Sequence, residues 1–154
     1  MSFKFREQLA IGEAGEALFL EHYPEPLILY SGKSADFIAI DSGDLVELKS
    51  DMYPMDKTTN FFFERWSDVA KKKPGGPWQS RRNSVDRFIY MFAQDGTYFE
   101  FSDVGALCAR LEELIVDLKP VKVYNTSWVT EGYKIPRLLL TDLYVEAQIE
   151  KEDS

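Results

Sequence analysis

The chain has 154 residues, a formal net charge of −8 and a hydrophobic content of 45%. The length suits one domain over residues 1–154, and the apolar fraction excludes a globally disordered chain. The acidic balance excludes a generally basic nucleic-acid-binding surface but leaves room for a local basic patch. One cysteine and one histidine cannot form a His/Cys zinc site. Because no apolar run reaches the ~18–20 residues of a membrane span, we expect a cytoplasmic protein with no membrane partner.

The first third of the chain predicts a helix followed by short strands. Good helix formers indicate a helix over residues 3–23, which Pro24 ends. A short apolar run at 27–30 predicts a strand. Two further short segments, 36–40 and 45–49, flank a polar turn and predict a hairpin.

The middle of the chain predicts more strands and a second helix. Residues 60–66 contain three consecutive phenylalanines and indicate a buried strand. Segments 88–92 and 97–101 predict a second hairpin. Ser102 is then expected to cap an amphipathic helix over 103–119.

The last third predicts strands at 121–124 and 135–140, and a charged tail at 150–154 that is expected to fray. The order of helix, strands, helix and strands is typical of an α/β or α+β fold. We therefore expect a mixed β-sheet flanked by helices.

The first hairpin places three charged residues on one predicted face. With the turn centred between Ser42 and Gly43, Asp36 would oppose Lys49, and Glu47 would be the diagonal neighbour of Asp36. The Cα atoms of such neighbours are roughly 7–8 Å apart. Two carboxylates at this separation can bind one cation, and Mg²⁺ prefers carboxylate and carbonyl oxygens. The alternative is an Asp36–Lys49 ion pair in a plain interaction domain.

These residues resemble the core signature of the PD-(D/E)xK nuclease superfamily. Asp36 is followed, after ten residues, by the segment Glu47-Leu48-Lys49. Ala35 stands where the family name has proline. The resemblance covers about residues 10–92 and implies a restriction-endonuclease-like fold. It is supported by the sequences around the hairpin, GEAGE at 12–16, NFFFE at 60–64, KPGGP at 73–77 and SVDRFIY at 84–90.

The resemblance also implies a metal site. Asp36 and Glu47 would ligate Mg²⁺, or Mn²⁺ as a substitute, and the Leu48 carbonyl would be a further oxygen ligand. Lys49 would position or deprotonate the attacking water and offset phosphate charge. These roles suit phosphodiester hydrolysis, because a bound metal polarises a phosphoryl oxygen and acidifies its water.

Glu16 would supply the helix-borne acid of the site. Glu13 is the competing choice, because the two glutamates lie on one helical flank. Gly15 favours Glu16, since a glycine beside it permits close approach of the helix to the sheet. A solvated helix face is the alternative for either residue.

A basic segment lies inside this acidic chain. Residues 71–90 carry six Lys and Arg against one Asp, and glycines and prolines within residues 73–78 predict a loop. Contacts with nucleic-acid phosphates carry no sequence information. We expect five cations of the segment to make such contacts, with a solvated loop as the alternative: Lys71, Lys72, Lys73, Arg81 and Arg82.

The sequence therefore predicts a Mg²⁺-dependent nuclease that hydrolyses phosphodiester bonds in DNA, with an endonuclease favoured over an exonuclease. Duplex and branched DNA, and also RNA, stay open as substrates. A homodimer is a family-based expectation. The alternative is a catalytically silent nucleic-acid-binding module with the same fold.

Overall fold

The computed structural model describes residues 3–149, with side-chain burial from residue 13 onward. The predicted tail at 150–154 lies outside these residues. Strands and helices share the described chain, which confirms the α+β class. None of the described helices combines the length and apolar composition needed to cross a bilayer. The helices are α1 (Phe3–His22), α2 (Trp78–Arg82) and α3 (Val104–Ile115), with two short 3₁₀ helices, η1 (Met55–Lys57) and η2 (Arg137–Leu140).

The larger sheet has six strands in the order β1-β2-β3-β6-β7-β10. Its two central strands, β3 and β6, are parallel, and the other neighbours are antiparallel. The sheet is therefore mixed, as the sequence predicts. Its strands are β1 (Leu27–Leu29), β2 (Phe37–Ala39), β3 (Leu45–Asp51), β6 (Arg87–Phe92), β7 (Thr97–Phe101) and β10 (Tyr144–Gln148).

A second, antiparallel sheet was not predicted from the sequence. It has the order β5-β4-β9-β8, and β4 forms its longest pairing, with β9. The extent of such a sheet depends on partners distant in the chain, which local patterns do not specify. Its strands are β4 (Asn60–Asp68), β5 (Lys73–Pro74), β8 (Val121–Tyr124) and β9 (Val129–Pro136).

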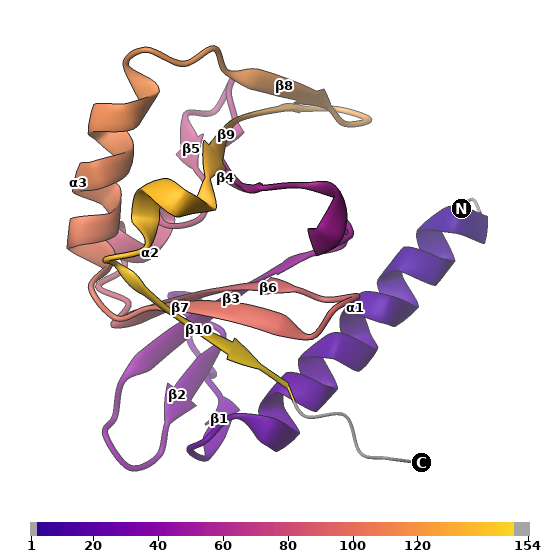
Figure 1. The fold of residues 1–154 in the computed structure, drawn as a ribbon, viewed down its shortest axis with the longest axis vertical. Coiled ribbons are helices and arrows are strands. Elements are labelled where there is room, and N and C mark those ends of the chain that lie inside the picture. Colours follow the sequence, from indigo (N-terminus) through magenta and orange to yellow (C-terminus); the bar gives the residue numbers. More distant parts are fainter. Residues whose placement is uncertain (1–2, 150–154) are drawn as a thin grey trace.

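Two apolar clusters cover the two faces of the six-stranded sheet. Side chains of β6 alternate between them, since Ile89 and Met91 pack with Phe19 of α1 while Tyr90 packs with Phe61 of β4. Figure 1 shows α1 on one side of this sheet, and α3 with the second sheet on the other. The larger cluster, rich in phenylalanine, holds the two sheets together.

Three sequence predictions for the second half of the chain were wrong. The N-cap of α3 is Asp103 rather than Ser102, and its carboxylate accepts a hydrogen bond from the Ala106 N–H at 2.9 Å. The helix ends at Ile115 rather than 119, because Val116 is exposed and has no core to contact. Residues 137–140 form η2, and only β9 reaches into the predicted strand 135–140.

Candidate active site

The β2–β3 hairpin has a wider turn than the sequence predicted. Ile38 pairs with Leu45 and Phe37 with Val46, whereas the prediction placed Asp36 opposite Lys49. The turn widens because the Gly43 N–H donates to the Ala39 carbonyl and Gly43 adopts a left-handed φ of 76°. The correction is a shift by two residues, so every side chain keeps its predicted face.

The corrected register brings Asp36 and Glu47 closer than expected. Continuing it by one residue places Asp36 directly opposite Glu47 instead of diagonal to it. Burial, followed by the charge of Asp36 and a hydrogen bond to its carboxyl, raises the pKa of Glu47 to about 8. The two carboxyls therefore form a pair that is costly to ionise fully without a cation.

The backbone of β3 completes the oxygen-rich edge. The Leu48 N–H donates to Oδ2 of Asp36 at 2.9 Å, so Leu48 turns its polar backbone groups away from β6 and toward Asp36. In a strand, the N–H and C=O of one residue face the same neighbour. The Leu48 carbonyl therefore lies on the side of the carboxyl pair, while the Leu48 side chain is buried.

Helix α1 brings a third acid toward this pair. Burial and the charges of Asp36 and Glu13 raise the pKa of Glu16 above its ordinary value. The close approach predicted for Gly15 is present, since a Cβ there would lie 3.3 Å from the Cβ of Ala93. Glu16 is thus the helix-borne glutamate that Asp36 influences, although its side chain is exposed.

Lys49 points to the face that carries Glu47, and its partner is a residue of the other sheet. Its Nζ lies 3.4 Å from Oε1 of Glu64 on β4. This pairing and the corrected register replace the alternative Asp36–Lys49 ion pair. The sequence left Glu64 without a role, although its position after three phenylalanines placed it on a strand.

A cleft of about 790 Å³ opens beside Lys49, between the end of β3 and the second sheet. Lys57 and Lys134 contribute positive charge to it, and Asp51 and Asp56 contribute negative charge. Asp36 and Glu47 do not line this cleft. Of the candidate site residues on β3, Lys49 lines the cleft and Glu47 does not.

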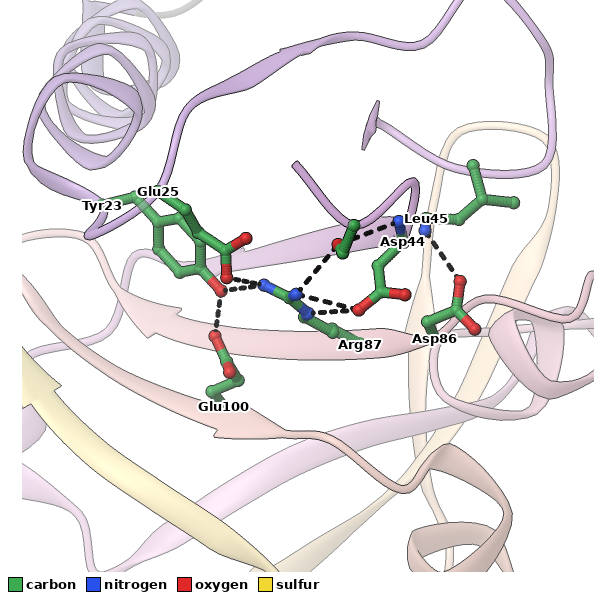
Figure 2. Close-up of polar contacts among 8 residues, drawn as sticks. Tyr23, Glu25, Asp44, Leu45, Asp86, Arg87 and Glu100 are labelled. Carbon is green, nitrogen blue, oxygen red and sulfur yellow. Dashed lines mark hydrogen bonds and ion pairs between the residues drawn. The ribbon is translucent and has the colours of Figure 1, made fainter. Parts of the chain in front are cut away.

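Arg87 at the start of β6 anchors the hairpin that carries the site (Figure 2). It donates to Asp44 at 2.8 and 3.0 Å, to Tyr23 at 3.0 Å, and also to Glu25. Next to it, Asp86 accepts from the Leu45 N–H at 2.8 Å. These contacts fix the end of the wide turn and the chain after α1 against β6.

The five predicted nucleic-acid contacts are all exposed, but only three of them share a pocket. Lys72, Arg81 and Arg82 line a pocket of about 390 Å³. Lys71 and Lys73 lie outside its lining, and Arg81 also pairs with Glu112 at 3.6 Å. Pro74 and Trp78, from the predicted basic loop, also line this pocket, and sequence reasoning missed the two residues of β4 that complete it, Arg65 and Trp66.

The candidate site offers few side-chain ligands for a metal ion. Among the residues whose side chains are described, no group of three or more His, Cys, Asp and Glu lies close enough to hold a metal ion. The donor set therefore consists of the Asp36 and Glu47 carboxyls and the Leu48 carbonyl. Two carboxylates with a backbone oxygen suit Mg²⁺, which usually keeps several waters.

Comparisons of the chain with protein-family models, curated proteins and solved structures found no match.

Proposed function

We propose that this protein is a Mg²⁺-dependent nuclease that hydrolyses phosphodiester bonds in DNA, acting as an endonuclease. The observation that carries the proposal is the hairpin register, which continues to place Asp36 opposite Glu47, with Lys49 two residues further along the same strand face. A carboxyl pair whose proton affinity is raised by burial and by its own repulsion gains from binding a divalent cation. An amine beside it can contact the phosphate or the attacking water.

The residues present fit a hard cation. Asp36 and Glu47 would hold Mg²⁺ with the Leu48 carbonyl, and water would complete the coordination. The bound ion would supply a polarised phosphoryl oxygen and a more acidic water. Lys49 would donate to the phosphate or orient the water, and Glu64 holds its Nζ at 3.4 Å. Glu16 would hold a further water from the helix side.

The distribution of charge supports a nucleic-acid substrate, and the resemblance favours DNA. The chain is acidic overall, yet Lys72, Arg81 and Arg82 share one basic pocket. Such a local concentration of cations attracts phosphate while the remaining surface does not. RNA is the competing substrate, and parallel assays on both polymers decide between them.

A catalytically silent nucleic-acid-binding module is the second candidate. It is favoured by the lack of a three-ligand metal group among the described side chains and by the ion pair that engages Lys49. Such a module would keep the basic pocket and its DNA affinity, but would not cleave.

Cleavage assays separate the two candidates. Supercoiled plasmid, linear duplex, branched DNA and RNA are incubated with the protein in Mg²⁺, Mn²⁺ or EDTA. The nuclease proposal expects cleavage in either metal, none in EDTA, and a loss of about 10²–10⁴-fold in Lys49→Ala. Lys119→Ala, an exposed lysine beyond α3, is the matched control. Equal inactivity of wild type and Lys49→Ala on every substrate would sink the nuclease proposal.

A further inference from the structure

The pocket of Arg65 and Trp66 joins three cations of the predicted basic segment to two residues of β4 that the sequence did not indicate. Its lining contains four cations and no carboxylate, which sets it apart from the acidic chain around it. Its volume of about 390 Å³ falls within the ~300–1,000 Å³ of small-molecule sites. The cations and the two indoles are Arg65, Lys72, Arg81, Arg82, Trp66 and Trp78.

A β-bulge explains how Arg65 enters this pocket. Opposite β9, Glu64 pairs with Gly132 and Trp66 pairs with Glu131, so Arg65 is the extra residue between them. Bulges redirect side chains and are frequent next to active sites. The Arg65 guanidinium lies 4.2 Å from the ring centroid of Trp66 and 5.0 Å from that of Trp78.

Stacking prepares Arg65 to bind an anion. The indoles cover the flat faces of a guanidinium, so its N–H edges stay free to form paired bonds to phosphate oxygens. Arg65 makes no ion pair within the described part of the chain. Trp78 is 6% exposed, so its indole is a fixed surface for Arg65 to pack on.

The neighbouring turn adds a positioned charge. Lys72 has a φ of 52°, which is uncommon for a residue with a side chain and costs of the order of 1 kcal/mol. The loop that follows packs on β4, since the Gly75 N–H donates to the Arg65 carbonyl at 3.3 Å. A Cβ on Gly75 would lie 2.5 Å from Cβ of Glu64, the partner of Lys49. The pocket and the candidate active site are therefore built on adjacent residues of one strand.

We propose that this pocket binds a backbone phosphate of a nucleic-acid strand, away from the phosphate that is cleaved. The inference rests on the proposed function for the identity of the polymer, but it does not require cleavage. Arg65 provides the paired hydrogen bonds, and Lys72 and Arg82 add charge that forms no ion pair among the described side chains. Arg81 joins them when it leaves its exposed pair with Glu112.

Binding measured in EDTA tests the pocket separately from metal-dependent chemistry. The probes are a fluorescein-labelled duplex and the matching single strand, titrated by anisotropy at several salt concentrations. Arg65→Gln and Lys72→Gln should each weaken binding of at least one probe about 5–20-fold. Each should also lower the slope of log K against log salt, by about 0.9 for duplex or about 0.7 for single strand. Lys33→Gln and Lys119→Gln, exposed cations outside the pocket, should stay within about twofold of wild type.

The outcomes distinguish this inference from the proposed function. If the pocket variants bind more weakly and the wild type cleaves no substrate, the pocket assignment is supported and the nuclease proposal is refuted. Pocket variants that fold, and bind and cleave like the controls, would refute the pocket and leave the nuclease standing. If Arg65→Gln unfolds, Lys72→Gln alone decides, because Lys72 is exposed in a turn. Equal affinity for polyglutamate would also overturn the assignment to phosphate.

Discussion

The Nζ of Lys49 lies 3.4 Å from Oε1 of Glu64, and this ion pair joins the two sheets beside the carboxyl pair. The two side chains are 37% and 27% exposed, so the pair contributes little to stability. Its effect is on position, because it restricts a flexible amine on the face that carries Glu47. We therefore expect Glu64 to act as a positioning residue for Lys49.

Replacing Glu64 should therefore affect turnover more than folding. Glu64→Gln keeps the shape of the side chain and removes the charge that holds Lys49. We expect kcat for DNA cleavage to fall about tenfold, with KM and the unfolding midpoint nearly unchanged, and Glu64→Asp to recover part of the loss. The matched control is Asp142→Asn, which removes the exposed ion pair with Arg110. A rise in KM with kcat unchanged would contradict the positioning role.

The carboxyl pair should make metal-free stability depend on pH. Folding raises the pKa of Glu47 from its ordinary 4.5 to about 8, so between these values the folded protein holds a proton that the unfolded chain releases. Stability in EDTA should fall as pH rises through this window. Glu47→Gln should match wild type near pH 4.5 and exceed it above pH 8, by about 1–3 kcal/mol after solvent screening. Urea unfolding at each pH measures the difference, and parallel pH curves would contradict it.

Mg²⁺ should offset the loss of stability that ionising the Asp36–Glu47 pair causes. A ligand at 100 times its Kd stabilises the folded state by about 2.7 kcal/mol, or roughly 5–10 °C for a chain of this size. Asp36→Asn retains an acceptor for the Leu48 N–H but loses one charge, so it should abolish the thermal shift. Without metal at pH 8 its melting temperature should equal or exceed that of wild type. Asp117→Asn, on an exposed loop, should keep the full shift, and retention of it by Asp36→Asn would refute the metal site.

The sequence was sufficient for the part of the site that depends on local patterns. Alternation along 36–40 and 45–49 assigned Phe37, Ala39, Val46 and Leu48 to one buried face, and all four are buried. A turn wider by two residues changed which residues are opposite each other, but not the face of any of them. Patterns with period two are insensitive to such even shifts.

The parts that sequence reasoning missed depend on long-range pairing. Arg65 reaches its pocket through a bulge defined only by the register of β4 against β9. Residues 138–140 are three consecutive leucines without a strand period, and periodicity alone cannot assign such a run. The chain bends there because Arg137 donates to the Thr58 carbonyl at 2.9 Å and to the Asn60 carbonyl at 3.2 Å. These partners are far away in the sequence.

Among the residues that hold the β2–β3 hairpin in place, Arg87 should cause the largest loss of stability when it is replaced. Its side chain is 13% exposed and pairs with Glu25 and Asp44. Arg87→Met would leave these carboxylates without their partner and should destabilise the fold by about 2–4 kcal/mol. Arg110→Met, which removes the more exposed arginine paired with Asp142, should destabilise the fold far less. Equal losses in urea unfolding would show that the contacts in Figure 2 do not hold the hairpin.

Any side chain at Gly75 should destabilise the fold, because the loop packs directly on β4, the strand that carries Glu64. A Cβ there would lie 2.5 Å from both Cβ and the carbonyl oxygen of Glu64, and that backbone cannot move without displacing β4. Gly75→Ala should destabilise by about 1–3 kcal/mol and, by shifting Glu64, reduce DNA cleavage further than the stability loss explains. Gly105→Ala is the control, since its Cβ would lie 3.6 Å from Asp103 and alanine favours the helix. Equal unfolding midpoints for the two variants would mean that the loop does not hold Glu64 in place.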